Sequence, residues 1–151
     1  GIKWPNDLLI DGKKAAGILL EASAEYGSLQ YVIAGVGISV NLKEEDYPEE
    51  LRVKAASLAM QAGRKIERTK LLAAFLLEWE QLYGLYLREG FAPIKLLWEA
   101  LAVSLGKMIV CNTAQGQLEG FAESIDDQGA LIVRMEDGTK RKIFSGDVDF
   151  K

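Results

Sequence analysis

The sequence has no histidine and only one cysteine, Cys111. The lack of histidine excludes a histidine general base, a Ser-His-Asp or Cys-His triad and any His-ligated metal. A single cysteine excludes an intrachain disulfide and a multi-cysteine zinc site, and it favours a reducing, cytoplasmic location. Any chemistry must therefore come from Lys, Asp, Glu, Tyr or backbone amides.

Long apolar runs are also missing. No stretch approaches the ~20 residues that span a bilayer, and the N-terminus lacks the basic-then-apolar layout of a signal peptide. The 18 Lys and Arg are outnumbered by 22 Asp and Glu, which gives a net charge of −4. Phosphate-backbone binding favours the opposite sign, so we interpret Lys140-Arg141-Lys142 as a solvated strand face. Neither a membrane nor a nucleic-acid partner is expected from this segment.

What the sequence does contain is enough apolar chain for a sizeable core, 49% of 151 residues. Residues 1–42 predict a three-stranded antiparallel meander, with Asp11-Gly12 as a two-residue hairpin turn. The segment from Leu29 to Val40 is almost continuously apolar, which predicts a strand buried on both faces.

The middle of the chain, residues 46–102, predicts helices that bury one side of this sheet. Apolar residues recur at three- and four-residue spacing from about Arg68 to Arg88, Gly90 ends that helix, and a shorter one follows from about Pro93 to Leu101. Pro48 and the glutamates after it predict an earlier helical segment that ends at Gly63.

From Lys107 onward, short strands separated by glycine turns at roughly ten-residue spacing predict a small SH3-like β-barrel. So small a core should pack against the helices. The predicted fold is thus α+β: an antiparallel or mixed sheet covered by helices, followed by the barrel. We expect two domains, residues 1–104 and 105–151.

Three features of the meander could carry chemistry. They are Lys3-Trp4-Pro5-Asn6-Asp7, then Lys13-Lys14 with Gly17, and then Gly35-Val36-Gly37. The two lysines point to opposite faces of a strand, and glycines in apolar strands permit close approach of a ligand. Adjacent strands would bring a cation, a carboxylate and bare backbone to one pocket, suited to a flat apolar ligand with an anionic group. A turn entering a strand and a solvated lysine pair remain the simpler alternatives.

These motifs, in this order and spacing, resemble those of biotin protein ligases. The matching segments are Lys3-Trp4-Pro5-Asn6-Asp7-Leu8, Lys14-x-x-Gly17-Ile18-Leu19-x-Glu21 and Gly35-x-Gly37-Ile38, followed by Ser57-Leu58, Ile125-x-x-x-Gly129-x-Leu131 and Ser145-Gly146-Asp147-Val148. The resemblance covers essentially all of the chain but only the back part of the family's catalytic domain. Because the chain also begins at Gly1 rather than Met, we interpret it as a fragment.

The resemblance implies part of a class II synthetase-like catalytic domain and a two-step reaction. Biotin and Mg-ATP would form biotinyl-5′-AMP, and a lysine of a biotin carboxyl carrier protein would then take the biotin. It implies that Lys14 stabilises the charge that develops in the first step, and that Asp7 receives the acceptor lysine in the second.

The remaining site residues are also implied by the resemblance. Gly17, Leu19, Gly35 and Gly37 would join Lys14 in binding biotin. The nucleotide would be contacted by Lys3, Asn6, Ser39 and Asn41, and no residue is assigned to a metal. Ser39 stands where the family usually has Asn, and the family's Gly/Arg-rich loop, which precedes these motifs, is absent.

Two other interpretations of the chain's function stay open at this point. A lipoate or octanoate transferase shares the catalytic fold, and a truncated, non-catalytic chain could serve as a binding module. An exposed strand edge could also support a homodimer.

Overall fold

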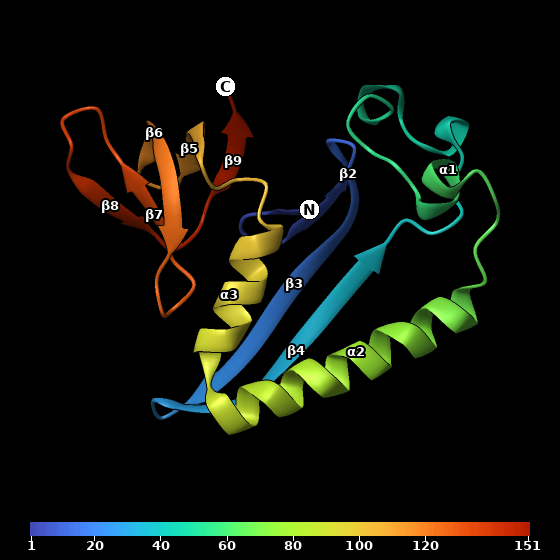
Figure 1. Cartoon of the computed structure of the whole chain (residues 1–151), viewed down its shortest axis with the longest axis horizontal. Helices are drawn as coiled ribbons and strands as arrows, with labels where there is room; N and C mark the ends of the chain where they lie inside the picture. Colours follow the sequence, from blue (N-terminus) through green and yellow to red (C-terminus); the bar gives the residue numbers. More distant parts are fainter. The chain divides into compact units, whose positions relative to one another are not determined.

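The computed structural model describes all residues, 1–151, as two compact units (Figure 1). The first, called here the meander unit, comprises residues 6–68; the second, the barrel unit, comprises residues 1–5 together with residues 69–151. The first five residues thus group with the C-terminal part of the chain. The division at residues 104 and 105 stays a prediction.

The meander unit contains three antiparallel strands, β2 (Asp7–Ile10), β3 (Lys13–Glu25) and β4 (Ser28–Ile38). Asp11 and Gly12 connect the first two with positive φ angles of 49° and 76°, the conformation that a tight hairpin requires. The predicted meander and its first turn are therefore confirmed.

Strand β4 differs from its prediction. Its residues from Ser28 to Gly37 are exposed, and Ile33 retains 54% of its accessible surface. The prediction that this strand is buried on both faces was wrong. A run of apolar residues favours burial, but burial needs covering layers, and β4 pairs with β3 alone.

Short helical turns follow the sheet in the meander unit. They are η1 (Glu44–Asp46), η2 (Glu49–Leu51) and α1 (Leu58–Ala62). Ser57 begins α1 by accepting a hydrogen bond from the Met60 amide at 3.1 Å, and Gly63 ends it at φ 63°. The end at Gly63 agrees with the sequence prediction, whereas the helical segment before it is broken into single turns.

Two longer helices follow, α2 (Arg68–Glu89) and α3 (Phe91–Leu101). Gly90 separates them with φ 76°, and Pro93 lies in the first turn of α3, where its missing N–H costs no hydrogen bond. Helix α2 contains no buried residue, so the burial expected for its apolar face is absent in this structure. Its aromatic side chains instead contact one another along the helix, from half-buried Phe75 through exposed Trp79 and Tyr83 to exposed Tyr86.

Five antiparallel strands form the barrel in the order β8-β7-β6-β5-β9. They are β5 (Lys107–Thr113), β6 (Gly116–Ile125), β7 (Leu131–Arg134), β8 (Lys140–Ile143) and β9 (Asp147–Phe150). Phe91 and Trp98 of α3 pack against its core, as expected for so small a sheet. The short strand β1 (Ile2–Lys3) belongs to this unit as well, where Ile2 accepts a backbone hydrogen bond from Val103 at 2.8 Å.

No helix of the chain combines the length and the apolar character needed to cross a bilayer.

Candidate functional site

A pocket of about 500 Å³ lies over strands β3 and β4 of the meander unit. Its lining consists of Asn6, Lys14, Gly17, Ile18, Leu19, Gly35, Val36 and Gly37. Six of these were named from the sequence as candidate ligand-binding residues; Ile18 and Val36 were not. Those two lie next to the predicted positions along β3 and β4, and the sequence analysis gave them no role of their own.

The strand register explains why the glycines meet at this pocket. Gly17 is opposite Gly37, and Leu19 is opposite Gly35. Directly paired residues share a face of a sheet, as do residues two apart on one strand. Three glycines and one leucine therefore occupy one patch, where the backbone is accessible to a flat ligand.

Gly35 and Gly37 are not required by the fold. A Cβ on Gly35 would lie 3.5 Å from the Leu19 carbonyl oxygen, and one on Gly37 would lie 3.9 Å from the Gly17 carbonyl oxygen. Both are ordinary van der Waals distances, and neither residue has positive φ. What the missing side chains provide is open space above the sheet.

Gly17 has a different reason to be glycine. A Cβ there would lie 3.2 Å from Lys14 Cε and 3.3 Å from both Lys14 Nζ and Asp7 Oδ1. The glycine thus makes room for an ion pair, in which Lys14 Nζ lies 2.6 Å from Asp7 Oδ1. The Lys14 side chain keeps 53% of its accessible surface, while that of Asp7 keeps 17%, so the ammonium faces solvent more than the carboxylate does.

A β-bulge brings the two charges together. Asp7 is opposite Gly17, but between Leu8 and Leu9 the register shifts, so that Leu9 is opposite Lys14. Without the extra residue, Lys14 and Gly17 would lie on opposite faces, because three positions separate them. The bulge places the lysine on the face that carries Asp7.

The backbone of Lys14 is fixed by a distant segment. Its amide donates to the Lys54 carbonyl at 2.7 Å, and its carbonyl accepts from the Ala56 amide at 2.9 Å. The next residue, Ser57, is fully buried and donates to the Leu42 carbonyl at 2.6 Å. Sequence reasoning missed this anchor, because about forty residues, including most of β3 and all of β4, separate its parts.

Asn6, Ser39 and Asn41 are each held by hydrogen bonds to the backbone. The Asn6 side chain donates to the Ile18 carbonyl at 2.7 Å, and the Ile18 amide donates to the backbone carbonyl of Asn6 at 3.0 Å. The Ser39 amide donates to Ala15 at 2.9 Å. The Asn41 side chain contacts both the amide and the carbonyl of Ile66 at 2.9 Å, so here it braces a loop.

Lys3 and Trp4 belong to the barrel unit. Lys3 Nζ lies 2.9 Å from Asp147 Oδ1. Trp4 is 3% exposed within the barrel core; its indole donates to the Gly129 carbonyl at 3.1 Å and its amide to Ser104 Oγ at 2.9 Å. The Lys-Trp-Pro-Asn-Asp motif is thus divided between the two units. The turn interpretation gave no hint that its tryptophan is a core residue.

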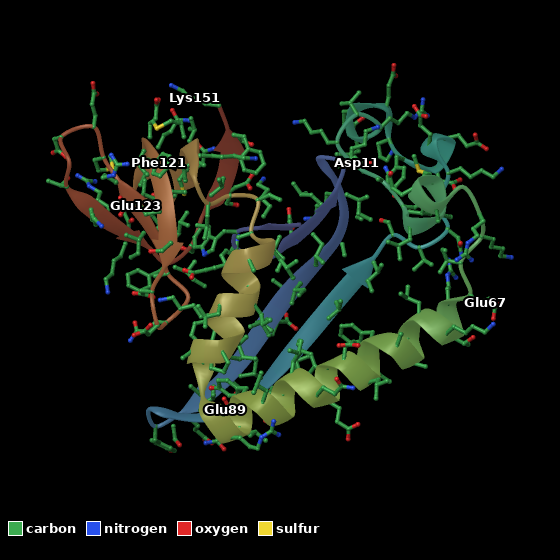
Figure 2. The ribbon with its side chains drawn as sticks, in the orientation of Figure 1. Asp11, Glu67, Glu89, Phe121, Glu123 and Lys151 are labelled. Atoms are coloured by element: carbon green, nitrogen blue, oxygen red, sulfur yellow. The ribbon has the colours of Figure 1, made fainter.

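The barrel carries its own charged cluster around two acids, Glu123 on strand β6 (Figure 2) and Asp126 directly after that strand. Hydrogen bonds from Lys140 and Arg134 hold the pKa of Glu123 below its ordinary value of 4.5. Hydrogen bonds from Lys142 and from the Gln128 amide likewise lower the pKa of Asp126 from 3.8. The three basic residues of β8 therefore include two, Lys140 and Lys142, that are paired within the barrel.

Buried Cys111 and the acidic groups offer no metal centre. Burial, followed by the charge of Asp147, raises the pKa of the Cys111 thiol, which keeps it in the protonated form that binds metals poorly. No three His, Cys, Asp or Glu side chains come close enough together to hold a metal ion.

Comparison with known proteins places this geometry in a family. Residues 1–39 match the Biotin/lipoate A/B protein ligase family, and residues 104–151 match the Biotin protein ligase C terminal domain. The Bifunctional ligase/repressor BirA of Bacillus spizizenii is 45% identical over 148 residues, which cover 98% of this chain and 45% of that protein. The Biotin–[acetyl-CoA-carboxylase] ligase of Paracoccus denitrificans is 36% identical over 137 residues, 88% of this chain and 56% of that protein.

Solved structures agree with the sequence matches. The biotin protein ligase of Aquifex aeolicus in complex with biotin and ATP superposes with a TM-score of 0.80 at 25% identity, covering 99% of this chain and 61% of that one. The chain belongs to the biotin protein ligase family, and the predicted α+β fold with an SH3-like C-terminal barrel is confirmed. It spans about half the length of the curated relatives it matches.

Proposed function

We propose that this chain provides the biotin-facing wall and the reactive charges of a biotin protein ligase. The observation that carries the proposal is the Lys14–Asp7 ion pair at 2.6 Å beside a wall of glycines. A flat, fused ring system fits against bare backbone, while an ammonium at the pocket attracts the ligand's anionic end.

In the first step, an oxygen of the biotin carboxylate attacks the α-phosphorus of ATP. The bond from that phosphorus to the pyrophosphate breaks, and biotinyl-5′-AMP remains. Negative charge grows around the phosphorus as the two anions approach, and the Lys14 ammonium stabilises it and aligns the reactants. Its anchored backbone fixes the point from which this side chain extends toward the pocket.

In the second step, the amine of an acceptor lysine attacks the carbonyl carbon of the mixed anhydride. The bond from that carbon to the phosphate oxygen breaks, AMP leaves, and the amine loses a proton. The carboxylate of Asp7 would hold the incoming ammonium and receive or relay that proton. The acceptor we propose is the lysine of a biotin carboxyl carrier protein, in the cytoplasm.

Magnesium would arrive with the ATP phosphates in this scheme. The pocket lining offers no carboxylate, and Mg²⁺ is commonly bound through phosphates and one or two carboxylates. For the nucleotide, the residues proposed are Asn6, which lines the pocket, and Ser39, while Asn41 braces the nearby loop through Ile66. The nucleotide contact expected for Lys3, which pairs with Asp147 in the barrel unit, stays a prediction.

Binding of a non-hydrolysable biotinyl-AMP analogue, measured by calorimetry, tests the proposal. Lys14→Ala should weaken the affinity by about tenfold or more, because a charge-assisted hydrogen bond is lost. Lys13→Ala is the matched control, since the Lys13 ammonium contacts the Arg52 carbonyl at 3.4 Å and lies outside the pocket lining. Equal losses in both variants, or equal affinity for a lipoyl analogue, would contradict a biotin-specific site.

A further inference from the structure

The Lys14–Asp7 pair is unequal in how its two members are satisfied. Asp7 Oδ1 is shielded from solvent and has no hydrogen-bond donor other than the Lys14 ammonium. Lys14, by contrast, lines the open pocket and carries three N–H donors that can turn toward another acceptor. The carboxylate oxygen therefore depends on the lysine, but the lysine does not depend on the carboxylate.

An anion in the pocket changes the charge balance of this pair. Before binding, one ammonium faces one carboxylate, and the pair is neutral. A bound phosphate or carboxylate competes with Asp7 for the same ammonium, so the cluster becomes net negative. A shielded carboxylate whose partner is shared or withdrawn is costly unless another cation replaces it.

We propose that ligand binding draws Lys14 toward the ligand anion and thereby opens a cation-binding position at Asp7. The proposal rests on the function proposed above and adds an order to it: the acceptor ammonium binds at Asp7 only after the activated ligand is in place. Gly17 permits this exchange, because no side chain there blocks the path of the Lys14 ammonium.

Thermodynamic linkage supplies the test. If the ligand opens a site for an ammonium, the ammonium must raise the affinity for the ligand by the same factor. We would measure binding of the biotinyl-AMP analogue by calorimetry, with and without Nα-acetyl-lysinamide near saturation. Its uncharged counterpart Nα-acetyl-norleucinamide serves as the control at matched ionic strength. The lysine probe should tighten analogue binding by about fivefold or more, and the norleucine probe should leave it unchanged.

Asp7→Asn should remove this coupling. The variant should also bind the analogue more tightly than wild type without any amine, because Lys14 is no longer shared, whereas the uncharged alcohol biotinol should bind both proteins equally. Asp11→Asn is the matched control: it removes the same charge from the hairpin turn of the same sheet (Figure 2) and should keep the coupling.

The experiment distinguishes failure of the Lys14 exchange from failure of the proposed ligase function. If wild type binds the analogue selectively but the lysine probe has no effect, or has the same effect in Asp7→Asn, the exchange is wrong and the ligase site stands. If wild type binds neither the analogue nor biotinol better than a lipoyl compound, the proposed function fails and the exchange with it.

Discussion

At the scale of single residues, Gly35 and Gly37 differ from Gly17 in why the position carries no side chain. The first two leave space that the fold does not need, while Gly17 gives room to a pair of charged side chains. The sequence could indicate that glycines in an apolar strand permit a close approach. It could not distinguish an approach by a ligand from one by a neighbouring lysine, because that depends on the register of the strands.

This difference predicts opposite effects on stability and on binding. Gly35→Ala or Gly37→Ala should keep or raise the free energy of unfolding, by up to about 1 kcal/mol, because alanine loses less backbone entropy on folding. The same methyl group should weaken analogue binding by about 1–3 kcal/mol through steric conflict with the ligand. Denaturant unfolding and calorimetry measure the two effects on the same samples.

Gly120→Ala is the matched control for these variants. A Cβ there would lie 2.6 Å from the Arg134 carbonyl oxygen in the barrel, so this change should destabilise the protein. Unaltered analogue affinity in both pocket variants would mean that the ligand does not lie over the glycines.

At the scale of elements, local patterns predicted the hairpin at Asp11-Gly12 and the long helix from Arg68, but not the β-bulge before Gly17. Turn and helix signals are carried by neighbouring residues. A register shift of one residue leaves no such signal, because it depends on how two strands pair. The burial of β4 failed for a related reason: an apolar run says nothing about which layers cover it.

Ser57 connects several elements around the site and should matter for stability. Its hydroxyl both caps α1 and donates to the Leu42 carbonyl. Ser57→Ala should lower the free energy of unfolding by about 1–3 kcal/mol, since the Leu42 carbonyl loses the donor that the buried hydroxyl provides and the helix loses its cap. Urea denaturation followed by circular dichroism measures the loss.

Exposed Ser28, at the start of β4, provides the comparison. Ser28→Ala should change the free energy of unfolding by less than about 0.5 kcal/mol. If the Ser57→Ala and Ser28→Ala variants had the same free energy of unfolding, the hydrogen bonds of Ser57 would stabilise the fold no more than hydrogen bonds to water do.

At the scale of the whole molecule, Trp4 near the start of the chain lies in the core of the C-terminal barrel. Trp4 packs among residues of β5, β6 and β7 and binds Gly129 and Ser104. Short-range sequence reasoning sees only the turn around Pro5, because the partners of Trp4 lie about a hundred residues away. The composition of the barrel strands, by contrast, was sufficient to predict the barrel itself.

The charged cluster of the barrel should make its stability sensitive to acid. The pKa values of Glu123 and Asp126 are lowered in the folded state, so their stabilising effect is complete above the unfolded values of 4.5 and 3.8. It is lost as the pH falls through the lower folded values, because the folded protein must then take up protons that weaken its ion pairs.

Glu123→Gln should therefore flatten the fall in melting temperature between neutral and acidic pH. Calorimetric melting of wild type and the Glu123→Gln variant across this pH range measures the effect. Glu136→Gln is the control, because Glu136 is exposed. A wild-type-like acid profile in Glu123→Gln would show that its pairs with Lys140 and Arg134 are too well solvated to stabilise the barrel.

The anchoring of Trp4 has a consequence for building chimeric enzymes. An exchange of C-terminal barrels between two ligases is naturally cut near residue 104, where the matched C-terminal domain begins. Such a cut would transplant a barrel without the indole that fills its core and leave the recipient's tryptophan facing foreign side chains. A stable chimera should therefore take two segments from the same donor, the barrel and the Lys3-Trp4 dipeptide. The dipeptide lies about a hundred residues before the barrel in the sequence and has to be exchanged separately.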